Sequence, residues 1–257
     1  MVSSNFRKEA REKLSGKWGK GVCITLAYTI ILMILNSIET LFSGAIQALI
    51  SLAIIIIQVP LVFGLIISFV KLFNQEKIKV FDFFLLGFKN FGRSWRIAFQ
   101  IFLKLILPIL LMVIAIVIMV AGGISQYSIA LISDDAAYGS IFFILIGSIL
   151  LIAASIWNIT KSYYYQLAYI IASENPDMSS EEAVEESEKL MNGKRWKLFC
   201  LQLSFIGWAI LAIFTLGIGY LWLAPYMQFA TIAFYKFVSS DNNSTKDSVV
   251  KEDKIED

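Results

Sequence analysis

The sequence predicts an all-α, polytopic membrane protein that crosses the bilayer six times, as three hairpins joined by short cytoplasmic or interfacial helices. First, the 257 residues are 58% hydrophobic and only 16% charged, whereas soluble proteins are about half apolar and a quarter charged. Second, the apolar residues form runs long enough to cross a hydrocarbon core of about 30 Å. Third, basic residues recur in alternate connections between these runs. A single soluble core is therefore excluded.

The first hairpin follows a basic segment that comprises residues 1–20. The first predicted span covers residues 21–38, and its apolar run is longer than the core of a signal peptide, which indicates an uncleaved helix. The second span covers residues 44–70. It is longer than a crossing requires and contains Pro60 and Gly64, so we expect a kink or a tilt there.

The second hairpin is predicted from residues 97–121 and 138–160, on either side of a polar loop that contains Asp134 and Asp135. We expect the fourth helix to continue along the membrane surface through a group of tyrosines: Tyr163, Tyr164, Tyr165 and Tyr169.

The last apolar stretch is too long for one span, and glycines in its middle predict a turn. We therefore expect a tight hairpin of two short helices, residues 198–216 and 219–237. A single span or a re-entrant segment remains the alternative, because each half is near the lower length limit for a crossing. Residues 239–257 are polar and lack aromatic side chains, which predicts a disordered cytoplasmic tail.

The orientation follows from the basic residues. They lie before the first span, between the second and third, between the fourth and fifth, and after the sixth, while the other connections contain none. Every Lys and Arg except Lys104 falls on one face under this topology. Cytoplasmic loops carry the excess of basic residues, so the sequence predicts that both termini lie in the cytoplasm.

Aromatic and basic side chains alternate over residues 80–95, before the third span. This composition is typical of a helix that lies in the membrane interface, with cations at anionic headgroups. Packing of the aromatics into the helix bundle is the competing interpretation. A glycine followed by basic residues around a tryptophan also precedes the first, third and fifth spans, which suggests either three related units or simple anchoring at the headgroups. The candidate lipid contacts are Trp18, Lys89, Arg93, Trp95, Arg96 and Trp196.

Few residues offer chemistry inside the spans. The sequence has no histidine and no Asp or Glu clearly within a span, so no catalytic, metal-binding or cofactor-binding residue is predicted, and a membrane-bound enzyme is the least favoured class. Lys104 lies about two turns into the third helix and shares a face with Gln100 and Pro108. Its amine either reaches back to the headgroups or contacts an anion in a polar site formed with Gln100.

One cytoplasmic helix is predicted in detail, over residues 180–191. Ser179 and Glu182 have the spacing of a capping box, and an Asn-Gly pair follows the helix. Small and apolar residues share one face, which is suited to docking on the bundle or on a partner. The carboxylates on the remaining surface are interpreted as solvated rather than metal-binding, because no other ligand type accompanies them.

Several motifs resemble a known bacterial family. They include Ala10-Arg11 and Leu14-Ser-Gly16-Lys-Trp18 near the start, Glu182-Ala183 and Leu190-Met191-Asn-Gly193, and Trp222-Leu-Ala-Pro225-Tyr226 near the end. The chain resembles the integral membrane family catalogued as domain of unknown function 975, which is found mainly in Gram-positive bacteria. The resemblance covers nearly the whole chain except the middle hairpin and the tail. It implies a bacterial plasma membrane and no particular activity.

Two function classes follow. The first is a non-enzymatic scaffold, envelope-homeostasis or partner-binding protein that acts through its cytoplasmic helices. The second is a small transporter or exporter of a hydrophobic or amphipathic substrate, which needs no charge inside the membrane. The expected partners are the lipid bilayer, especially anionic lipids, and a membrane protein. The net charge of +2 is too small to suggest nucleic acid.

Overall fold

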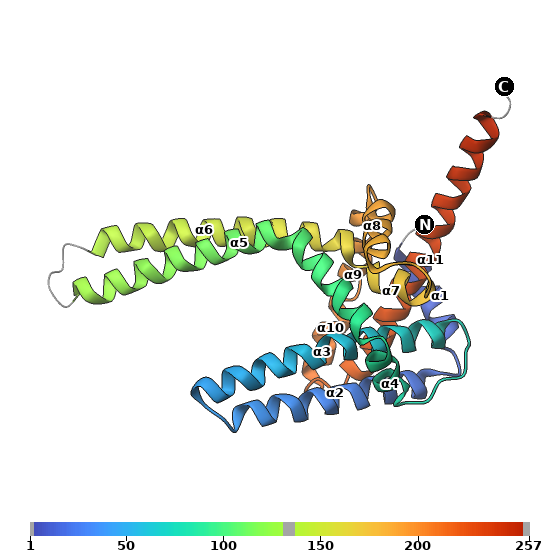
Figure 1. The fold of residues 1–257 in the computed structure, drawn as a ribbon, viewed down its shortest axis with the longest axis horizontal. Helices are drawn as coiled ribbons and strands as arrows, with labels where there is room; N and C mark the ends of the chain where they lie inside the picture. Colours follow the sequence, from blue (N-terminus) through green and yellow to red (C-terminus); the bar gives the residue numbers. More distant parts are fainter. Residues whose placement is uncertain (1–2, 131–136, 254–257) are drawn as a thin grey trace. The chain divides into compact units, whose positions relative to one another are not determined.

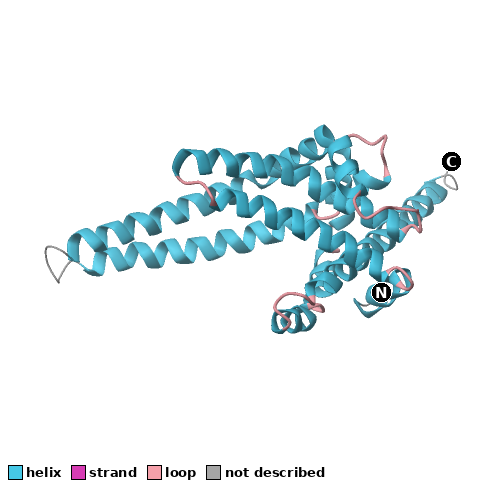
Figure 2. Cartoon of the chain, turned by 90° about the horizontal axis from the view of Figure 1, so that it is seen from below, coloured by secondary structure: helices cyan, strands magenta, loops and turns pink. Residues whose placement is uncertain are grey.

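The computed structural model describes residues 3–130 and 137–253, with side-chain surroundings for residues 3–123 and 141–242. The described part is 86% helix without strands (Figures 1 and 2), which confirms the all-α class. The predicted loop with Asp134 and Asp135 lies outside the described residues. The elements are α1 Ser3–Leu14, α2 Trp18–Thr40, α3 Gly44–Phe73, α4 Asp82–Lys89, α5 Phe91–Ala130, α6 Ala137–Ser162, η2 Tyr163–Tyr165, α7 Ala168–Glu174, α8 Ser180–Met191, α9 Arg195–Leu203, α10 Ile206–Phe214 and α11 Tyr220–Asp253.

Two compact units divide the chain. The first comprises Met1–Ala98 with Gln166–Asp257, and the second comprises Phe99–Tyr165. Five helical segments are long and apolar enough to cross a membrane, judged by length and composition: Trp18–Thr40, Gly44–Phe73, Phe91–Gly123, Ile141–Glu174 and Arg195–Phe214.

The predicted sixth span, residues 219–237, is not among these five segments. Its helix, α11, carries Gln228, Lys236 and several tyrosines, which lower its apolar character. α11 instead supplies buried core, because Phe229, Ala230 and Phe234 are each 0% exposed. The six-span topology therefore stays a prediction. The turn before α11 lies where the glycines indicated, and Gly217 adopts φ +84° there, a conformation that favours glycine.

The first unit is organised around α11. The N-terminal helix α1 docks on it through Phe6, whose ring lies 5.4 Å from the Phe234 ring and 5.5 Å from the Phe237 ring, between centroids. Phe6, Ala10 and Leu14 form the buried face of α1, with the i, i+4, i+8 spacing of an amphipathic helix. The basic N-terminal segment is therefore a folded part of the core.

Helices α3 and α4 approach each other closely at two glycines. A Cβ atom added to Gly64 would lie 1.9 Å from the Phe83 carbonyl oxygen, and one added to Gly87 would lie 2.3 Å from the Pro60 carbonyl oxygen. Contacts this short are possible only without side chains, as in closely packed membrane helices. The contact buries Phe83 completely, whereas Phe81 remains 65% exposed. Part of the aromatic segment 80–95 therefore packs into the bundle, and part stays on the surface.

The second unit is the hairpin of α5 and α6. A small-residue seam holds it together: a Cβ atom on Gly147 would meet the Met119 Cγ atom at 2.5 Å, and Ala115 and Ala154 are 0% and 2% exposed. Such seams let helix backbones approach in lipid. The outward residues are apolar and exposed, for example Ile149 at 68%, as expected of a surface that contacts hydrocarbon.

The capping box predicted for α8 is confirmed. The Glu182 N–H donates to the Ser179 Oγ atom at 3.1 Å, and the Ser179 N–H donates to a Glu182 carboxylate oxygen at 2.9 Å. The hydrogen bond from the Ser179 N–H to the carboxylate is the largest cause that lowers the pKa of Glu182 below its ordinary value. The small face predicted for α8 is buried, with Ala183 and Ser187 both 0% exposed.

Two other expectations differ from the structure. The tyrosine group does not prolong α6 as one helix, because η2 intervenes before α7 begins at Ala168. The chain expected to be disordered after residue 238 continues α11 to Asp253. Extending a formed helix adds one hydrogen bond per residue, so the packed part of α11 favours its own continuation.

Candidate functional site

One cavity of functional interest lies in the first unit, between two facing helical stripes. One stripe is on α10 and its C-terminal cap, and the other runs from the turn into α11. Both have the spacing i, i+3, i+4, i+7, which places their residues on one helical face. The stripes are Trp208, Leu211, Ala212 and Thr215, and Gly219, Trp222, Leu223 and Tyr226.

Helix α1 and the first residue of α2 complete the cavity with Arg7, Arg11 and Trp18. The cavity volume is about 590 Å³, within the usual range of ligand pockets, about 300–1,000 Å³. Arg11 is exposed and Arg7 is half-buried. The pocket therefore joins two cations to walls that are otherwise aromatic and aliphatic.

Arg7 is held by main-chain contacts on both sides. Its Nη1 atom donates to the Ser204 carbonyl at 3.4 Å, and the Tyr226 hydroxyl donates to the Arg7 carbonyl at 3.4 Å. The Nε atom of Arg7 is buried and has no hydrogen-bond partner. Leaving a buried donor unsatisfied costs about 1–3 kcal/mol.

Sequence reasoning did not identify this pocket. Arg7 and Arg11 contributed to the predicted orientation, Arg11 and Trp222 to the family resemblance, and Trp18 was a candidate lipid contact. The repeated i, i+3, i+4, i+7 spacing was the signal available in the sequence. This spacing identifies the two faces of the pocket. It does not show that α1 supplies the cations, because Arg7 is 197 residues from its contact Ser204 in the chain.

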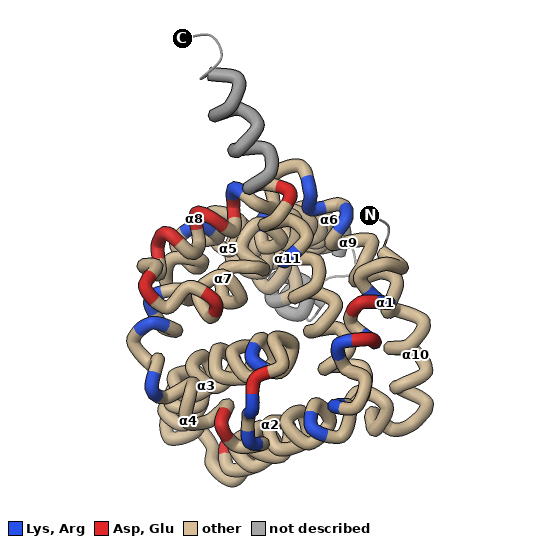
Figure 3. Tube along the Cα trace, turned by 90° about the vertical axis from the view of Figure 1, so that its right-hand side faces the viewer, with Lys and Arg blue, Asp and Glu red and all other residues tan. Residues whose placement is uncertain are grey.

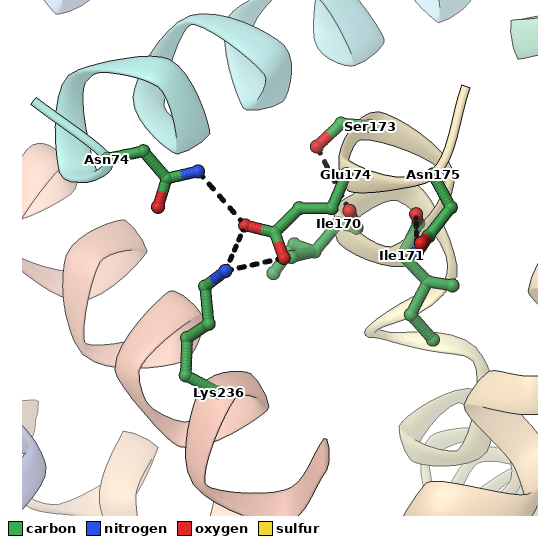
Figure 4. A network of polar contacts seen from close by, with 7 residues as sticks. All are labelled: Asn74, Ile170, Ile171, Ser173, Glu174, Asn175 and Lys236. Atoms are coloured by element: carbon green, nitrogen blue, oxygen red, sulfur yellow. Dashed lines mark hydrogen bonds and ion pairs between the residues drawn. The ribbon is translucent and has the colours of Figure 1, made fainter. Parts of the chain in front are cut away.

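A second polar cluster ties α3, α7 and α11 together (Figure 4). The Lys236 Nζ atom lies 2.6 Å from the Glu174 carboxylate, and the Asn74 side chain donates to the same carboxylate at 3.2 Å. The Glu174 side chain is only 14% exposed. A carboxylate this buried needs such partners, so the cluster fixes the C-terminal ends of α3 and α7 against the middle of α11.

Arg93, a predicted lipid contact, binds backbone within the first unit. Its guanidinium donates to the carbonyls of Asn175, Pro176 and Met178 at 2.7, 2.8 and 2.7 Å. These residues connect α7 to α8. The fork of N–H groups on arginine suits several acceptors at once, and here it fixes the loop from which α8 starts.

Trp95, another predicted lipid contact, also has a partner in the protein. Its Nε1 atom donates to the Ile56 carbonyl at 3.2 Å. In a regular helix the N–H of residue 60 would bond this carbonyl, but residue 60 is proline and lacks an N–H. Trp95 therefore satisfies the acceptor that Pro60 leaves free in α3.

The remaining candidate lipid contacts lie on the surface or at the pocket. Trp18 lines the pocket. Lys89 and Arg96 are exposed, and Trp196 is 72% exposed with its ring stacked on Phe199. Trp18 also lies 6.0 Å from the Tyr226 ring, between centroids, and the Arg96 Nε atom donates to the Gly92 carbonyl at 3.3 Å. Headgroup contact stays a prediction for all six candidates.

Lys104 and Gln100 lie one turn apart on α5. Lys104 is exposed and Gln100 is half-buried, while Pro108 on the same face is buried. An exposed lysine at this position can extend its amine toward headgroups. Within the residues that the structure describes, no group of three or more His, Cys, Asp or Glu residues is placed to hold a metal ion.

Comparison with known proteins matches the chain to a family. A family model described as "Protein of unknown function (DUF975)" matches residues 1–242. No curated protein and no solved structure matches. The family match covers nearly the whole length, from α1 into α11, so it concerns the chain as a whole.

Proposed function

We propose, from the premise that the chain belongs to the DUF975 family of proteins of unknown function, that it is a non-enzymatic integral protein of a bacterial plasma membrane. Its role in this proposal is that of a scaffold, whose cytoplasmic helices form a preassembled binding surface for a partner. The apolar segments that are long enough to span a membrane support the location. The absence of histidine supports a role without general acid-base catalysis.

The packing of the two terminal helices supports a cytoplasmic location for both. The Phe6 ring of α1 contacts the Phe234 and Phe237 rings of α11, so these segments share one side of the membrane. The chain between them must then cross an even number of times. The basic residues of α1, which include Arg7 and Lys8, place that side in the cytoplasm under the positive-inside rule.

Topology reporters test this arrangement. Reporters active only in the cytoplasm should work when fused after Asn74 or Asn192, and reporters active only outside should work after Glu39. A cytoplasmic signal after Glu39 would overturn the predicted first hairpin. An external signal after Asn192 would mean that the middle hairpin does not return to the cytoplasm.

The observation that carries the scaffold proposal is that contacts before and after α8 hold both of its ends in place. Arg93 fixes the loop before it. After it, Lys194 binds Asp241 of α11 at 2.7 Å and lowers the pKa of Asp241. α8 buries its small face while Glu181 and Glu185 remain exposed, and acidic residues follow the helix in Figure 3. A fixed acidic face suits a partner with a basic surface.

A photo-crosslinking amino acid placed at Glu181 or Glu185 tests the scaffold in cells. The expected result is one protein adduct with the probe at either position. A probe at Glu181 should lose the adduct when Glu185 is changed to lysine, and the reverse, because the lysine would repel the basic surface of the partner. The same probe at Lys20, which is exposed on α2, is the matched control. Equal adducts at all three positions, or none at either glutamate, would contradict the proposal.

The second candidate function is transport of an amphipathic substrate, and the pocket beside α1 favours it. Purified protein in proteoliposomes should then move a labelled amphiphile across the bilayer. Leu211→Trp, which adds volume to the pocket wall, should abolish that flux, whereas Ile210→Trp on another face of α10 should not. Flux that is equal in both variants would separate transport from this pocket.

A further inference from the structure

We propose that the pocket between α1, α10 and α11 binds one anionic phospholipid of the cytoplasmic leaflet. Its phosphate lies at Arg7 and Arg11, and an acyl chain lies between the stripes of α10 and α11. This inference goes beyond the proposed scaffold and holds whether the protein is a scaffold or a transporter.

The pocket has a polar end and an apolar end. Arg7 lies level with Tyr226, because the Tyr226 hydroxyl contacts the Arg7 carbonyl. Gly219, at the other end of the α11 stripe, is seven residues away, or about 10 Å along a helix. Leu211, Ala212 and Leu223 line the wall in between. A phospholipid has the same order of surfaces as the pocket, with a charged headgroup followed by a hydrocarbon chain.

The charge at the polar end fits a phosphate. Arginine is well suited to phosphate because its donors form a planar fork. Arg7 and Arg11 both line the pocket, so a phosphate bound there would lie beside two arginine side chains. Among the described residues, none that lines the pocket carries a carboxylate, and no internal anion therefore competes for the arginines there.

The surroundings favour a membrane lipid over a soluble anion. Trp208 and Trp222 in the pocket walls are 57% and 49% exposed. The tip of the same hairpin presents Phe214 at 80% and Leu216 at 94% exposure. Large apolar side chains this exposed are stable in hydrocarbon rather than in water, so the pocket opens where acyl chains are available. Tryptophans near arginines are also typical of the headgroup level.

The test is quenching of tryptophan fluorescence in the full-length protein, reconstituted in bilayers with either brominated phosphatidylglycerol or brominated phosphatidylcholine. The protein should favour the anionic lipid, and Arg7→Gln/Arg11→Gln should reduce that preference by about thirtyfold if each cation contributes as at an anionic surface. The matched control Lys8→Gln/Lys20→Gln removes the same charge from exposed positions and should keep most of the preference.

Further arms separate the alternatives. Arg11→Gln alone, which leaves the Arg7 contact with Ser204 intact, should retain part of the preference and guards against misfolding of the double variant. Leu211→Trp should reduce quenching by both lipids, and Ile210→Trp should not. An equal loss in the Arg and Lys pairs would overturn the proposal, as would the absence of any anionic preference. Full displacement of the lipid by excess inorganic phosphate would show that the site takes a free anion instead.

Discussion

The hydrogen bond from Trp95 to Ile56 makes a quantitative prediction. Trp95→Phe keeps an aromatic ring but removes the donor that lies 3.2 Å from the Ile56 carbonyl. Because Pro60 has no N–H, that carbonyl then has no partner in the chain. In the hydrocarbon core predicted around α3, where no water replaces the donor, an unsatisfied acceptor costs about 1–3 kcal/mol. This corresponds to a fall in Tm of about 2–4 °C per kcal/mol for a chain of this size.

The same reasoning predicts that Pro60→Ala removes most of this cost. The alanine of that variant would donate its own N–H to the Ile56 carbonyl in the ordinary helical pattern, so Trp95→Phe should then cost about 1 kcal/mol less than in the parent. Thermal unfolding of the four proteins of this double-mutant cycle measures the coupling. Trp196→Phe, at a ring that is 72% exposed, is the control and should leave Tm unchanged. An equal effect of Trp95→Phe in both backgrounds would refute the role assigned to the hydrogen bond.

Three further predictions follow from single positions. Gly64→Ala should destabilise the protein by about 1–3 kcal/mol, because its Cβ would overlap the backbone of α4, while Gly92→Ala, with open space around it, should not lower Tm. The lowered pKa of Glu182 means that its ionised form stabilises α8. This contribution is present at neutral pH and is lost as pH falls through the lowered pKa, so hydrogen exchange at the start of α8 should accelerate in acid. Glu182→Gln, which does not titrate, should remove that pH dependence. Lys104→Leu should leave membrane insertion and abundance unchanged, because a lysine that only reaches the headgroups is replaceable; a specific loss of activity at normal abundance would instead reveal a functional charge.

The features that were predicted well are those set by residues close together in the chain. The capping box of α8 joins residues three apart, and its buried face repeats at helical spacing, so local pattern was sufficient. The turn before α11 was indicated by Gly217 and Gly219 themselves. The apolar segments likewise follow from runs of composition, because a hydrocarbon core demands about 20 apolar residues wherever the segment packs.

Trp95 and Arg93 have protein partners that local pattern did not predict. Both side chains have an apolar body and a polar tip, which a membrane surface satisfies as well as a protein interior does. Their partners are 39 residues away for Trp95 and 82 to 85 for Arg93. Composition around residues 80–95 therefore agreed equally with lipid contact and with bundle packing. The contacts of Trp95 with α3 and of Arg93 with the loop after α7 are visible only in the three-dimensional structure.

Composition and charge order are enough to establish that this chain is a set of membrane-compatible helices with basic connections, because hydrophobicity and charge act through contiguous residues. The position of the last helix is decided only by the three-dimensional packing. Its length and hydrophobicity suggested a sixth span, whereas the structure places α11 in the core, where Phe229 and Phe234 are fully buried. The same packing brings Arg7 and Arg11 to the mouth of a pocket formed near the other end of the chain. Such a pocket depends on the distance between helices, which no stretch of sequence encodes on its own.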